Sequence, residues 1–462
     1  MVASEREQER LLFWRKNRMS IEKSKERRNV GILVGGGPAP GINGVVTAVT
    51  IGARKENLIV FGIFDGYKWL AKGDEIDINE YVKELRMRDV SRIHFDGGSY
   101  LRTSRINPIK INNGVQNCVK NLNKLGIKYM VTIGGDDTAY AASEIAKAAG
   151  GTIKFVHVPK TIDNDLPLPD NQPTFGYHTA CDLGTKLVKN LMEDARIMDR
   201  WFITVVMGRH TGHLALGISK SAGATLTIIP EEFGSRDYIP LSKVCDIFEA
   251  SIIKRRAMDH NHGVLVIAEG VAGRLSPDDL KKIPGIELEY DDFGNIRLGE
   301  VELGKILKLE IERRFRERND KITVVEINIG YVLRCADPIP YDQEYTRDLG
   351  YNAIHYLLSE APEHGENAMI SVIHGVLKPL PFGKLIDPGT KKTAIRYVDV
   401  ASERYKIARN YMVRLEQRDL DDPEFLHKMA EAAKMSTEEF KNRFGYLVNR
   451  NEKSLKQANY KT

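Results

Sequence analysis

Residues 30–43 read Val-Gly-Ile-Leu-Val-Gly-Gly-Gly-Pro-Ala-Pro-Gly-Ile-Asn, and this stretch decides the fold. Its first five residues are an apolar run that predicts a buried strand. Residues 45–51 are apolar and helix-like, so the glycines between form a strand-to-helix loop. Such a loop lets backbone N–H groups approach phosphate oxygens at a helix N-terminus, although it serves equally well as a tight turn.

The loop departs from two common nucleotide-binding patterns. Gly36 and Gly41 have the spacing of a P-loop, but Ile42 and Asn43 follow instead of lysine and a hydroxyl residue. The spacing also differs from the Gly-x-Gly-x-x-Gly of dinucleotide-binding loops. A phosphate site here therefore needs support from other motifs.

Further short β-branched runs alternate with amphipathic stretches along the chain. This alternation predicts an α/β fold of mainly parallel sheets wrapped by helices. Ligands of such sheets bind at the loops that follow the carboxyl ends of the strands. The runs cover residues 58–63, 129–133, 155–158, 201–207, 224–229, 264–268 and 323–329.

Length and composition narrow the class of protein. The 462 residues suit two packed domains with terminal extensions. Basic and acidic residues, 68 and 63 of them, are well mixed, which argues against a nucleic-acid partner. No apolar run approaches the length of a membrane span. The cysteines are far apart and fit reduced thiols in the cytoplasm; they are Cys118, Cys181, Cys245 and Cys335.

The two ends of the chain differ in character from its middle. Residues 1–29 are rich in Arg, Lys and Glu and predict an added helix; a transit peptide is the alternative, which the glutamates disfavour. From residue 400 onward the pattern is helical. Asp422-Pro423 begins one helix, and Ser436 with Glu439 forms a capping box ahead of another. Domain joints are expected near residues 169–173 and 336–340.

A second glycine loop, residues 132–138, also ends an apolar run. It contains Asp136 and Asp137, whose adjacent carboxylates repel each other unless a cation compensates. A Mg²⁺–phosphate complex would supply that compensation. The alternative is a pair of solvated turn carboxylates.

Two more polar loops follow predicted strands. In residues 158–165, Lys160 offers a positive charge for phosphate, Thr161 a hydroxyl, and the carboxylates a base for a sugar hydroxyl. In residues 207–213, Arg209 and the backbone at Gly208 suit a sugar phosphate. Zinc at the two histidines of that loop is disfavoured because no third ligand is visible. Arg105, Arg200 and Arg334 are further phosphate candidates at loop or strand ends.

Taken in order, these motifs resemble the phosphofructokinase family over about residues 30–410. The order is a Gly-Gly loop, Gly-Gly-Asp, Pro-x-Thr-Ile-Asp-Asn-Asp, Met-Gly-Arg, Glu-Gly and Tyr-x-x-Arg. The resemblance implies an α/β fold of two Rossmann-like domains with the active site in the cleft between them. Residues 30–173 and about 335–385 would form the phosphoryl-donor domain and 174–334 the fructose 6-phosphate domain. Residues 1–29 and the mostly helical 386–462 would be extensions.

The resemblance also assigns roles residue by residue. Asp163 matches the general base for the fructose 1-hydroxyl, beside Thr161 and Ile162, and Asp136 matches the Mg²⁺ ligand. Arg200 matches an arginine donated across a subunit interface, which implies a homodimer or homotetramer. The remaining sugar-phosphate contacts would be Met207, Gly208, Arg209, Glu269, Tyr331 and Arg334.

The phosphoryl donor depends on Asp137 and Lys160, which stand where ATP-using members have glycine. Pyrophosphate-dependent members resemble this chain at both positions. A carboxylate at Asp137 would repel a nucleotide α-phosphate, and Lys160 would neutralise a transferring or leaving phosphate. Gly36, Gly37 and Arg105 would hold the donor together with Lys160.

The expected function is reversible phosphoryl transfer from pyrophosphate to the 1-hydroxyl of fructose 6-phosphate, giving fructose 1,6-bisphosphate and phosphate, as in glycolysis and gluconeogenesis. The residues expected to carry the chemistry are Asp163, Lys160, Asp137, Thr161 and Arg209. The alternatives are an ATP-dependent 6-phosphofructokinase and a non-catalytic regulatory subunit. Tyr331 and Val325 stand where bacterial ATP-using members have histidine and arginine. The contacts that bind the 6-phosphate must therefore differ in detail.

Overall fold

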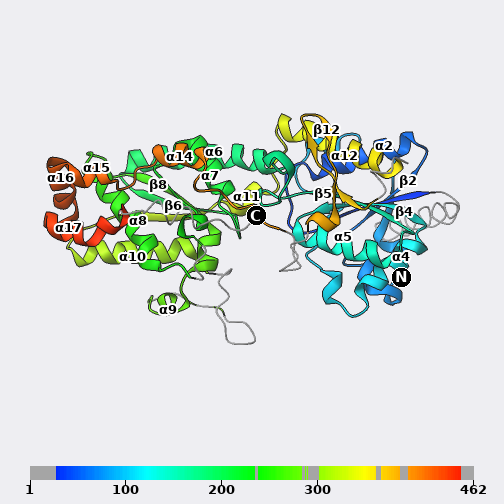
Figure 1. Cartoon of the computed structure of the whole chain (residues 1–462), viewed down its shortest axis with the longest axis horizontal. Coiled ribbons are helices and arrows are strands. Elements are labelled where there is room, and N and C mark those ends of the chain that lie inside the picture. Colours follow the sequence, from blue (N-terminus) through cyan, green and yellow to red (C-terminus); the bar gives the residue numbers. More distant parts are fainter. Residues whose placement is uncertain are drawn as a thin grey trace, which may run out of the picture. The chain divides into compact units, whose positions relative to one another are not determined.

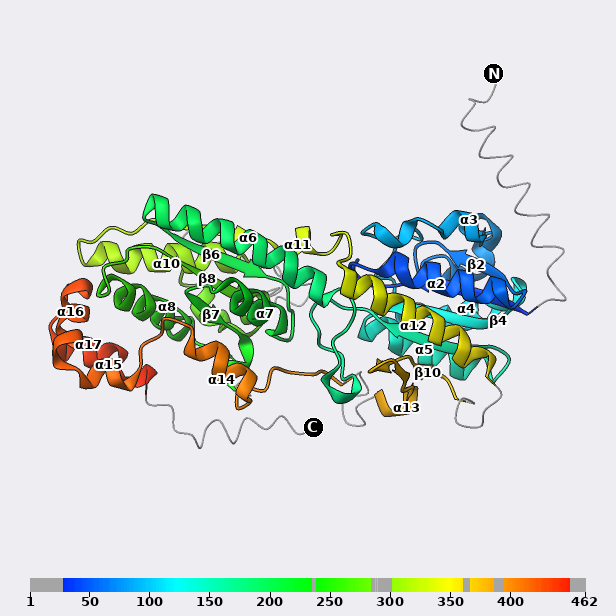
Figure 2. The same cartoon turned by 90° about the horizontal axis from the view of Figure 1, so that it is seen from above.

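The chain folds into two compact units in a computed structural model (Figures 1 and 2). The model describes residues 28–234, 238–283, 287, 289, 301–359, 366–385 and 394–448. Unit 1 comprises Met1–Ala180 and Arg334–Ile395, and unit 2 comprises Cys181–Leu333 and Arg396–Thr462. The helix predicted over residues 1–29 lies outside the described residues, except for Arg28 and Asn29.

A seven-stranded sheet organises unit 1, in the order β13-β10-β5-β4-β1-β2-β3. Its five inner strands are parallel, and the two edge strands β3 and β13 are antiparallel to their neighbours. The strands are β1 (Asn29–Val34), β2 (Ile59–Ile63), β3 (Val82–Leu85), β4 (Ile127–Gly134), β5 (Lys154–Pro159), β10 (Ala368–Met369) and β13 (Leu380–Pro381). Residues on the inner strands are buried on both faces, as parallel sheets require.

Helices cover both faces of this sheet. On one face α2 (Ile42–Lys55) and α12 (Pro340–Leu358) pack against Val30, Ile32 and Val34. On the other face α4 (Gly114–Lys124) and α5 (Asp136–Ala148) pack with Leu33. Smaller elements complete the described part of the unit: α3 (Met87–Val90), α13 (Phe382–Leu385) and a hairpin of β11 (Val372–Ile373) and β12 (Val376–Leu377).

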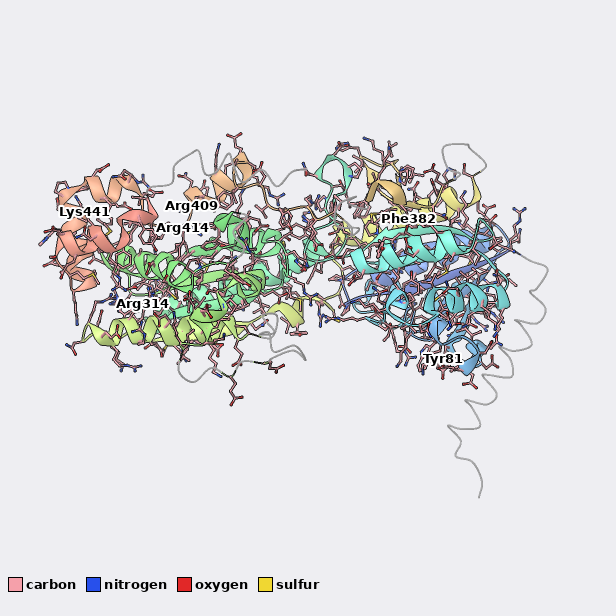
Figure 3. All side chains as sticks on the ribbon, turned by 60° about the horizontal axis from the view of Figure 1, so that its bottom comes forward. Tyr81, Arg314, Phe382, Arg409, Arg414 and Lys441 are labelled. Carbon is pink, nitrogen blue, oxygen red and sulfur yellow. The ribbon has the colours of Figure 1, made fainter. Side chains whose placement is uncertain are left out.

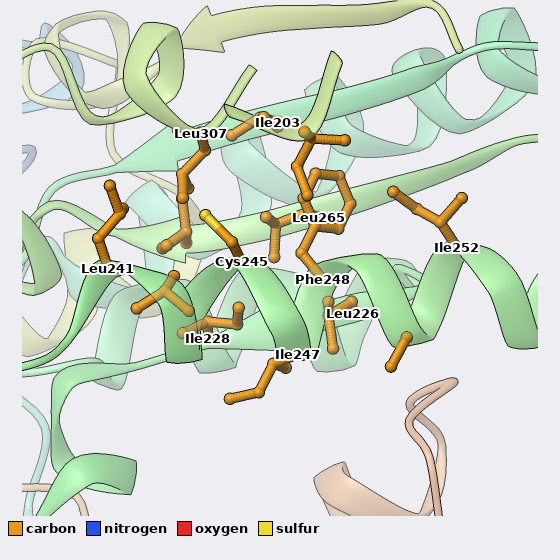
Figure 4. Packing of buried hydrophobic residues seen from close by; sticks show 14 of the residues in the cluster. Ile203, Leu226, Ile228, Leu241, Cys245, Ile247, Phe248, Ile252, Leu265 and Leu307 are labelled. Atoms are coloured by element: carbon orange, nitrogen blue, oxygen red, sulfur yellow. The ribbon is translucent and has the colours of Figure 1, made fainter. Parts of the chain in front are cut away.

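Unit 2 is built on a parallel four-stranded sheet in the order β7-β8-β6-β9. Phe248 and Ile252 of α8 (Leu241–Arg256) pack with Leu226 and Leu265 of the sheet (Figure 4). The strands are β6 (Trp201–Val206), β7 (Leu226–Ile228), β8 (Gly263–Ala268) and β9 (Val324–Asn328). The other helices are α6 (Tyr177–Met198, which begins in unit 1), α7 (His213–Ala222), α9 (Pro277–Leu280), α10 (Leu303–Glu317) and α11 (Gly330–Leu333).

The C-terminal part of unit 2 is helical, with α14 (Glu403–Asn410), α15 (Gln417–Asp421), α16 (Pro423–Ala433) and α17 (Thr437–Phe444). Both predicted helix starts are confirmed: Asp422 caps α16, and Ser436 with Glu439 forms the capping box of α17. Arg414, labelled in Figure 3, is buried and pairs with Glu232 at 2.6 Å between Nη1 and Oε2. Apolar packing and this ion pair fix the segment to the unit.

All eight apolar runs that the sequence predicts as strands are strands in the structure. The short strands β3, β10, β13 and the hairpin of β11 and β12 were not predicted from the sequence. In the described part of the chain no helix is long and apolar enough to cross a membrane.

Candidate active site

Three of the predicted loops meet at one edge of the unit 1 sheet. Strands β1, β4 and β5 are adjacent and parallel, with Leu33 paired to Thr132 and Thr132 paired to His157. Their carboxyl ends therefore place residues 35–37, 135–137 and 160–163 next to one another.

Close packing explains the glycines in the first two loops. A Cβ added at Gly35 or Gly134 would lie 2.5 Å or 2.4 Å from Thr138 Oγ1, so any side chain there collides with Thr138. Gly36 has φ of +79°, which favours glycine. Its N–H donates to the Ser104 carbonyl at 2.9 Å, and this contact holds the segment of Arg105 beside the loop.

Lys160 lies at the centre of these loops. It is 5% exposed, and its Nζ donates to the Gly37 carbonyl. Burial lowers the pKa of Lys160 to about 8; the carboxylates of Asp163 and Asp165 oppose this lowering, and Arg334 adds to it. The site thus contains a buried amine whose pKa lies well below that of an exposed lysine.

This pKa predicts how affinity for an anionic phosphoryl donor depends on pH. As pH rises through about 8, Lys160 loses its charge, so KM for the donor should rise between pH 7 and 9. Steady-state rates at several pH values measure this. Lys160→Arg is the control, because arginine keeps its charge between pH 7 and 9. Titration of the donor itself changes KM equally for both proteins. A wild-type profile that parallels the Lys160→Arg profile would contradict the prediction.

Hydrogen bonds hold the loop that carries Asp163. The Asp163 N–H donates to Thr161 Oγ1 at 3.0 Å, and the Thr161 carbonyl accepts from Thr174 Oγ1 at 2.7 Å. Asn164 is in the left-handed region, with φ of 57°, and its Oδ1 accepts from the Thr174 N–H at 3.1 Å. The sequence analysis missed Thr174, because a residue ten positions beyond Asn164 gives no local signal.

Arg334 and the two acidic residues of the second loop complete the unit 1 site. A Cβ on Gly37 would lie 3.2 Å from Arg334 Nη1, so this arginine is beside the first glycine loop. Asp136 and Asp137 are exposed in the first turn of α5, where the helix dipole favours negative charge. The N-terminal end of α12 is tied to the same region because Asp342, fully buried, accepts from the Gly176 N–H at 2.9 Å.

The remaining predicted residues, except Arg200, lie at the carboxyl edge of the unit 2 sheet. Residues 207–209 follow β6, Glu269 follows β8, and Tyr331 lies in α11 just after β9. A Cβ on Gly330 would lie 2.6 Å from Met207 Cγ, and Gly270 donates its N–H to the Gly208 carbonyl at 3.0 Å. Gly208 has φ of 138°, and a side chain there would meet the Thr211 carbonyl at 2.3 Å.

Arg200 lies apart from this group. It precedes β6, at the amino edge of the sheet, about 23 Å along the strand from Met207 at about 3.3 Å per residue. Its Nε donates to Asp194 Oδ1 at 2.7 Å, and its guanidinium lies over the Phe202 ring at 5.1 Å. Within unit 2, Arg200 therefore does not join the other predicted sugar-phosphate residues.

Glu231 supports the loop of Arg209, and the sequence analysis did not identify it. It is 2% exposed, and its carboxylate accepts from the Gly212 N–H at 2.9 Å and from the Val398 N–H at 3.0 Å. Burial raises the pKa of Glu231 to about 7, although these N–H donors favour the charged form. A glutamate within Pro-Glu-Glu-Phe gives no sequence signal of this burial.

The raised pKa of Glu231 predicts a pH-dependent stability. Because the folded state keeps this proton up to about pH 7 while the unfolded carboxyl loses it near 4.5, the group's contribution to stability is lost as pH rises through this range. The free energy of unfolding of wild type relative to Glu231→Gln should therefore fall from pH 4.5 to pH 7.5. Denaturant titrations of both proteins measure it, and a constant difference would contradict the prediction.

A buried amine among carboxylates and glycine loops, at the carboxyl edge of a parallel sheet, suits phosphoryl transfer, in which catalysis consists largely of positioning and charge stabilisation. The chain belongs to the phosphofructokinase family: the family model described as Phosphofructokinase matches residues 29–357. A pyrophosphate–fructose 6-phosphate 1-phosphotransferase of Thermotoga maritima is 52% identical over 419 residues, covering 91% of this chain and 98% of that protein. One of Naegleria fowleri is 48% identical over 436 residues, covering 93% and 98%.

Solved structures share the fold. Pichia pastoris phosphofructokinase in the T-state matches with a TM-score of 0.61 at 21% identity, over 91% of this chain and 39% of that longer one. A pyrophosphate-dependent phosphofructokinase of Marinobacter aquaeolei matches with a TM-score of 0.61 at 16% identity, over 88% and 92%. The predicted α/β fold with two Rossmann-like domains is confirmed.

Proposed function

We propose that the chain transfers a phosphoryl group reversibly from pyrophosphate to the 1-hydroxyl of fructose 6-phosphate. The observation that carries this is the buried Lys160 amine, which contacts the Gly37 carbonyl at the glycine loop. A fixed cation at this position suits a small, highly charged donor. Relatives with 52% and 48% identity bear the name of this activity.

The donor is held in unit 1. Gly36 and Gly37 let the loop backbone lie close to phosphate oxygens, and Lys160 stabilises charge on the transferring and leaving phosphates. Arg105 lies on the adjoining segment, which the Gly36 N–H holds by donating to the Ser104 carbonyl. Asp137, exposed at the start of α5, excludes a nucleotide α-phosphate by charge repulsion. Positioning and charge stabilisation of this kind account for most of phosphoryl-transfer catalysis.

Asp163 is the general base of the reaction. Its carboxylate takes the proton of the 1-hydroxyl as that oxygen forms a bond to phosphorus and the bridging bond of pyrophosphate breaks, releasing phosphate. The hydroxyl of Thr161 fixes the Asp163 backbone, and Thr174 fixes Thr161 in turn. Ile162, buried between them, anchors the loop in the core.

The residues present fit a Mg²⁺ ion that is carried on the donor phosphates. Among the described residues no three His, Cys, Asp or Glu side chains form a ready-made metal cage. Mg²⁺ typically binds one or two carboxylates together with substrate phosphates, and Asp136, exposed at this edge, is the carboxylate that would hold it. When bound, the ion neutralises phosphate charge.

Fructose 6-phosphate is held by the residues at the carboxyl edge of the unit 2 sheet and by Arg334. The turn of Met207, Gly208 and Arg209 contacts the sugar, Glu269 accepts from its hydroxyls, and Tyr331 and Arg334 bind the 6-phosphate. Residues 30–173 with about 335–385 thus act as the donor domain and residues 174–334 as the sugar-phosphate domain.

Arg200 acts in the site of a second subunit, in a homodimer or homotetramer. Its position at the amino edge of the sheet, about 23 Å along the strand from Met207, supports this. A symmetric pair of subunits then exchanges two such arginines.

Initial rates with fructose 6-phosphate and Mg²⁺ test the proposal. They are measured with pyrophosphate as the donor, with ATP as the donor, and without any donor. Turnover with pyrophosphate and formation of fructose 1,6-bisphosphate support it. Turnover with ATP only would assign the chain to the ATP-dependent members, and turnover with neither would favour a regulatory subunit.

A further inference from the structure

A histidine with no role in the proposed chemistry lies beside the loops that would bind the phosphoryl donor. These donor loops are residues 35–37, 135–137 and 160–163. His157 is on β5, three residues before Lys160, and is fully buried. Its Nε2 lies 2.9 Å from the Gly134 carbonyl oxygen, and its Nδ1 lies 2.9 Å from Thr132 Oγ1.

These contacts define the protonation of the ring. A carbonyl oxygen only accepts, so Nε2 carries the hydrogen and Nδ1 accepts from the Thr132 hydroxyl. Burial lowers the pKa of His157 to about 3, with Lys160 adding to the lowering, so the ring stays neutral at working pH. A buried neutral imidazole with both nitrogens engaged does not exchange protons with a substrate.

The Gly134 carbonyl is the point that this histidine controls. It accepts a second hydrogen bond from the Lys160 backbone N–H at 2.8 Å. The next residue, Gly135, is the N-cap of α5 and offers no side-chain cap, and Asp136 is the first residue of the helix. A pair of glycines has wide backbone freedom, so the peptide plane between them needs an external anchor.

We propose that His157 is a positioning residue for the phosphoryl donor: its Nε2–H fixes the Gly134 carbonyl and thereby the placement of Asp136 relative to Lys160. The inference rests on the proposed function, because it assumes that the donor binds at these loops. Loss of this hydrogen bond would loosen the donor loops while leaving the residues of unit 2 unchanged.

The test compares His157→Leu with His157→Gln, whose amide N–H replaces the Nε2–H. A net hydrogen bond of about 1 kcal/mol corresponds to roughly a fivefold change. We therefore expect KM for the donor to rise about fivefold or more in His157→Leu, KM for fructose 6-phosphate to stay within about twofold, and His157→Gln to recover most of the loss.

Phe155→Leu is the matched control, because Phe155 is also fully buried on β5 but has an apolar side chain, and its backbone N–H bond to Asn367 is kept in the variant. It should lower stability without separating the two KM values. If His157→Leu fails to fold, the double variant Thr132→Val, His157→Leu removes both polar side chains, so that the Thr132 hydroxyl is not left with the Val156 carbonyl at 3.3 Å as its remaining partner. Equal changes in both KM values, or none, in a folded variant would overturn the inference.

An independent readout is the tautomer of the ring, from nitrogen chemical shifts of the wild type with the signal assigned by its loss in His157→Gln. We expect the Nε2–H tautomer with no titration between pH 5 and 9, and an Nδ1–H or titrating ring would overturn the inference. If the wild type uses ATP instead of pyrophosphate, the proposed function fails, while the KM comparison made with ATP still tests His157.

Discussion

Asp163→Asn is expected to lower kcat about a thousandfold while KM for fructose 6-phosphate changes less than about threefold, as for loss of a general base. Asparagine keeps the size of the side chain but cannot accept the proton of the 1-hydroxyl. The loop itself should persist, because the Asp163 backbone N–H donates to Thr161 Oγ1 and asparagine keeps this hydrogen bond. Initial rates over a range of both substrates measure the two constants.

Asp165→Asn is the matched control for this variant. Both carboxylates favour the charged form of Lys160, so each substitution changes the electrostatics of the amine in the same direction. Only Asp163 has the proposed proton-transfer role, so Asp165→Asn should lose far less kcat, on the order of tenfold or below. Equal losses of kcat in the two variants would show that the carboxylates act through Lys160. Near-normal turnover of Asp163→Asn would show that Asp163 is not the general base.

The sequence predicted the strands and the loops of the site because both are local features. The eight apolar runs are strands, and the loops after β1, β4 and β5 end at one sheet edge, as parallel pairing demands. The sequence showed that positions 35 and 134 are glycine, but it did not show why no larger residue fits there. The cause is Thr138, which approaches both glycines, and such a contact is decided by tertiary packing.

Buried polar groups were the features that the sequence could not reveal. His157, Glu231 and Asp342 are each almost fully buried and each bind backbone N–H or C=O groups far away in the chain. Acidic residues are mostly exposed and histidine is intermediate, so residue type alone does not predict these buried positions. Their roles depend on partners up to 167 positions away, as for Glu231 with Val398.

The double variant Asp137→Gly, Lys160→Gly is expected to lose at least a hundredfold in kcat/KM with pyrophosphate. Removing one preorganised charge-stabilising group typically costs about 10²–10³ in rate, and here the buried cation beside the Gly37 carbonyl is removed. Loss of the Asp137 carboxylate at the start of α5 removes repulsion of a nucleotide α-phosphate, so ATP turnover should appear or increase.

The single variants separate the two effects. Lys160→Met keeps a side chain of similar length in the buried space but has no charge, so it should lose pyrophosphate turnover without gaining ATP turnover. Asp137→Gly should keep most pyrophosphate turnover, since Asp137 is exposed and acts against the wrong donor. Rates with both donors, measured on all variants with fructose 6-phosphate and Mg²⁺, distinguish these outcomes. Undiminished pyrophosphate turnover in Lys160→Met would mean that the buried amine serves the fold and that other residues select the donor.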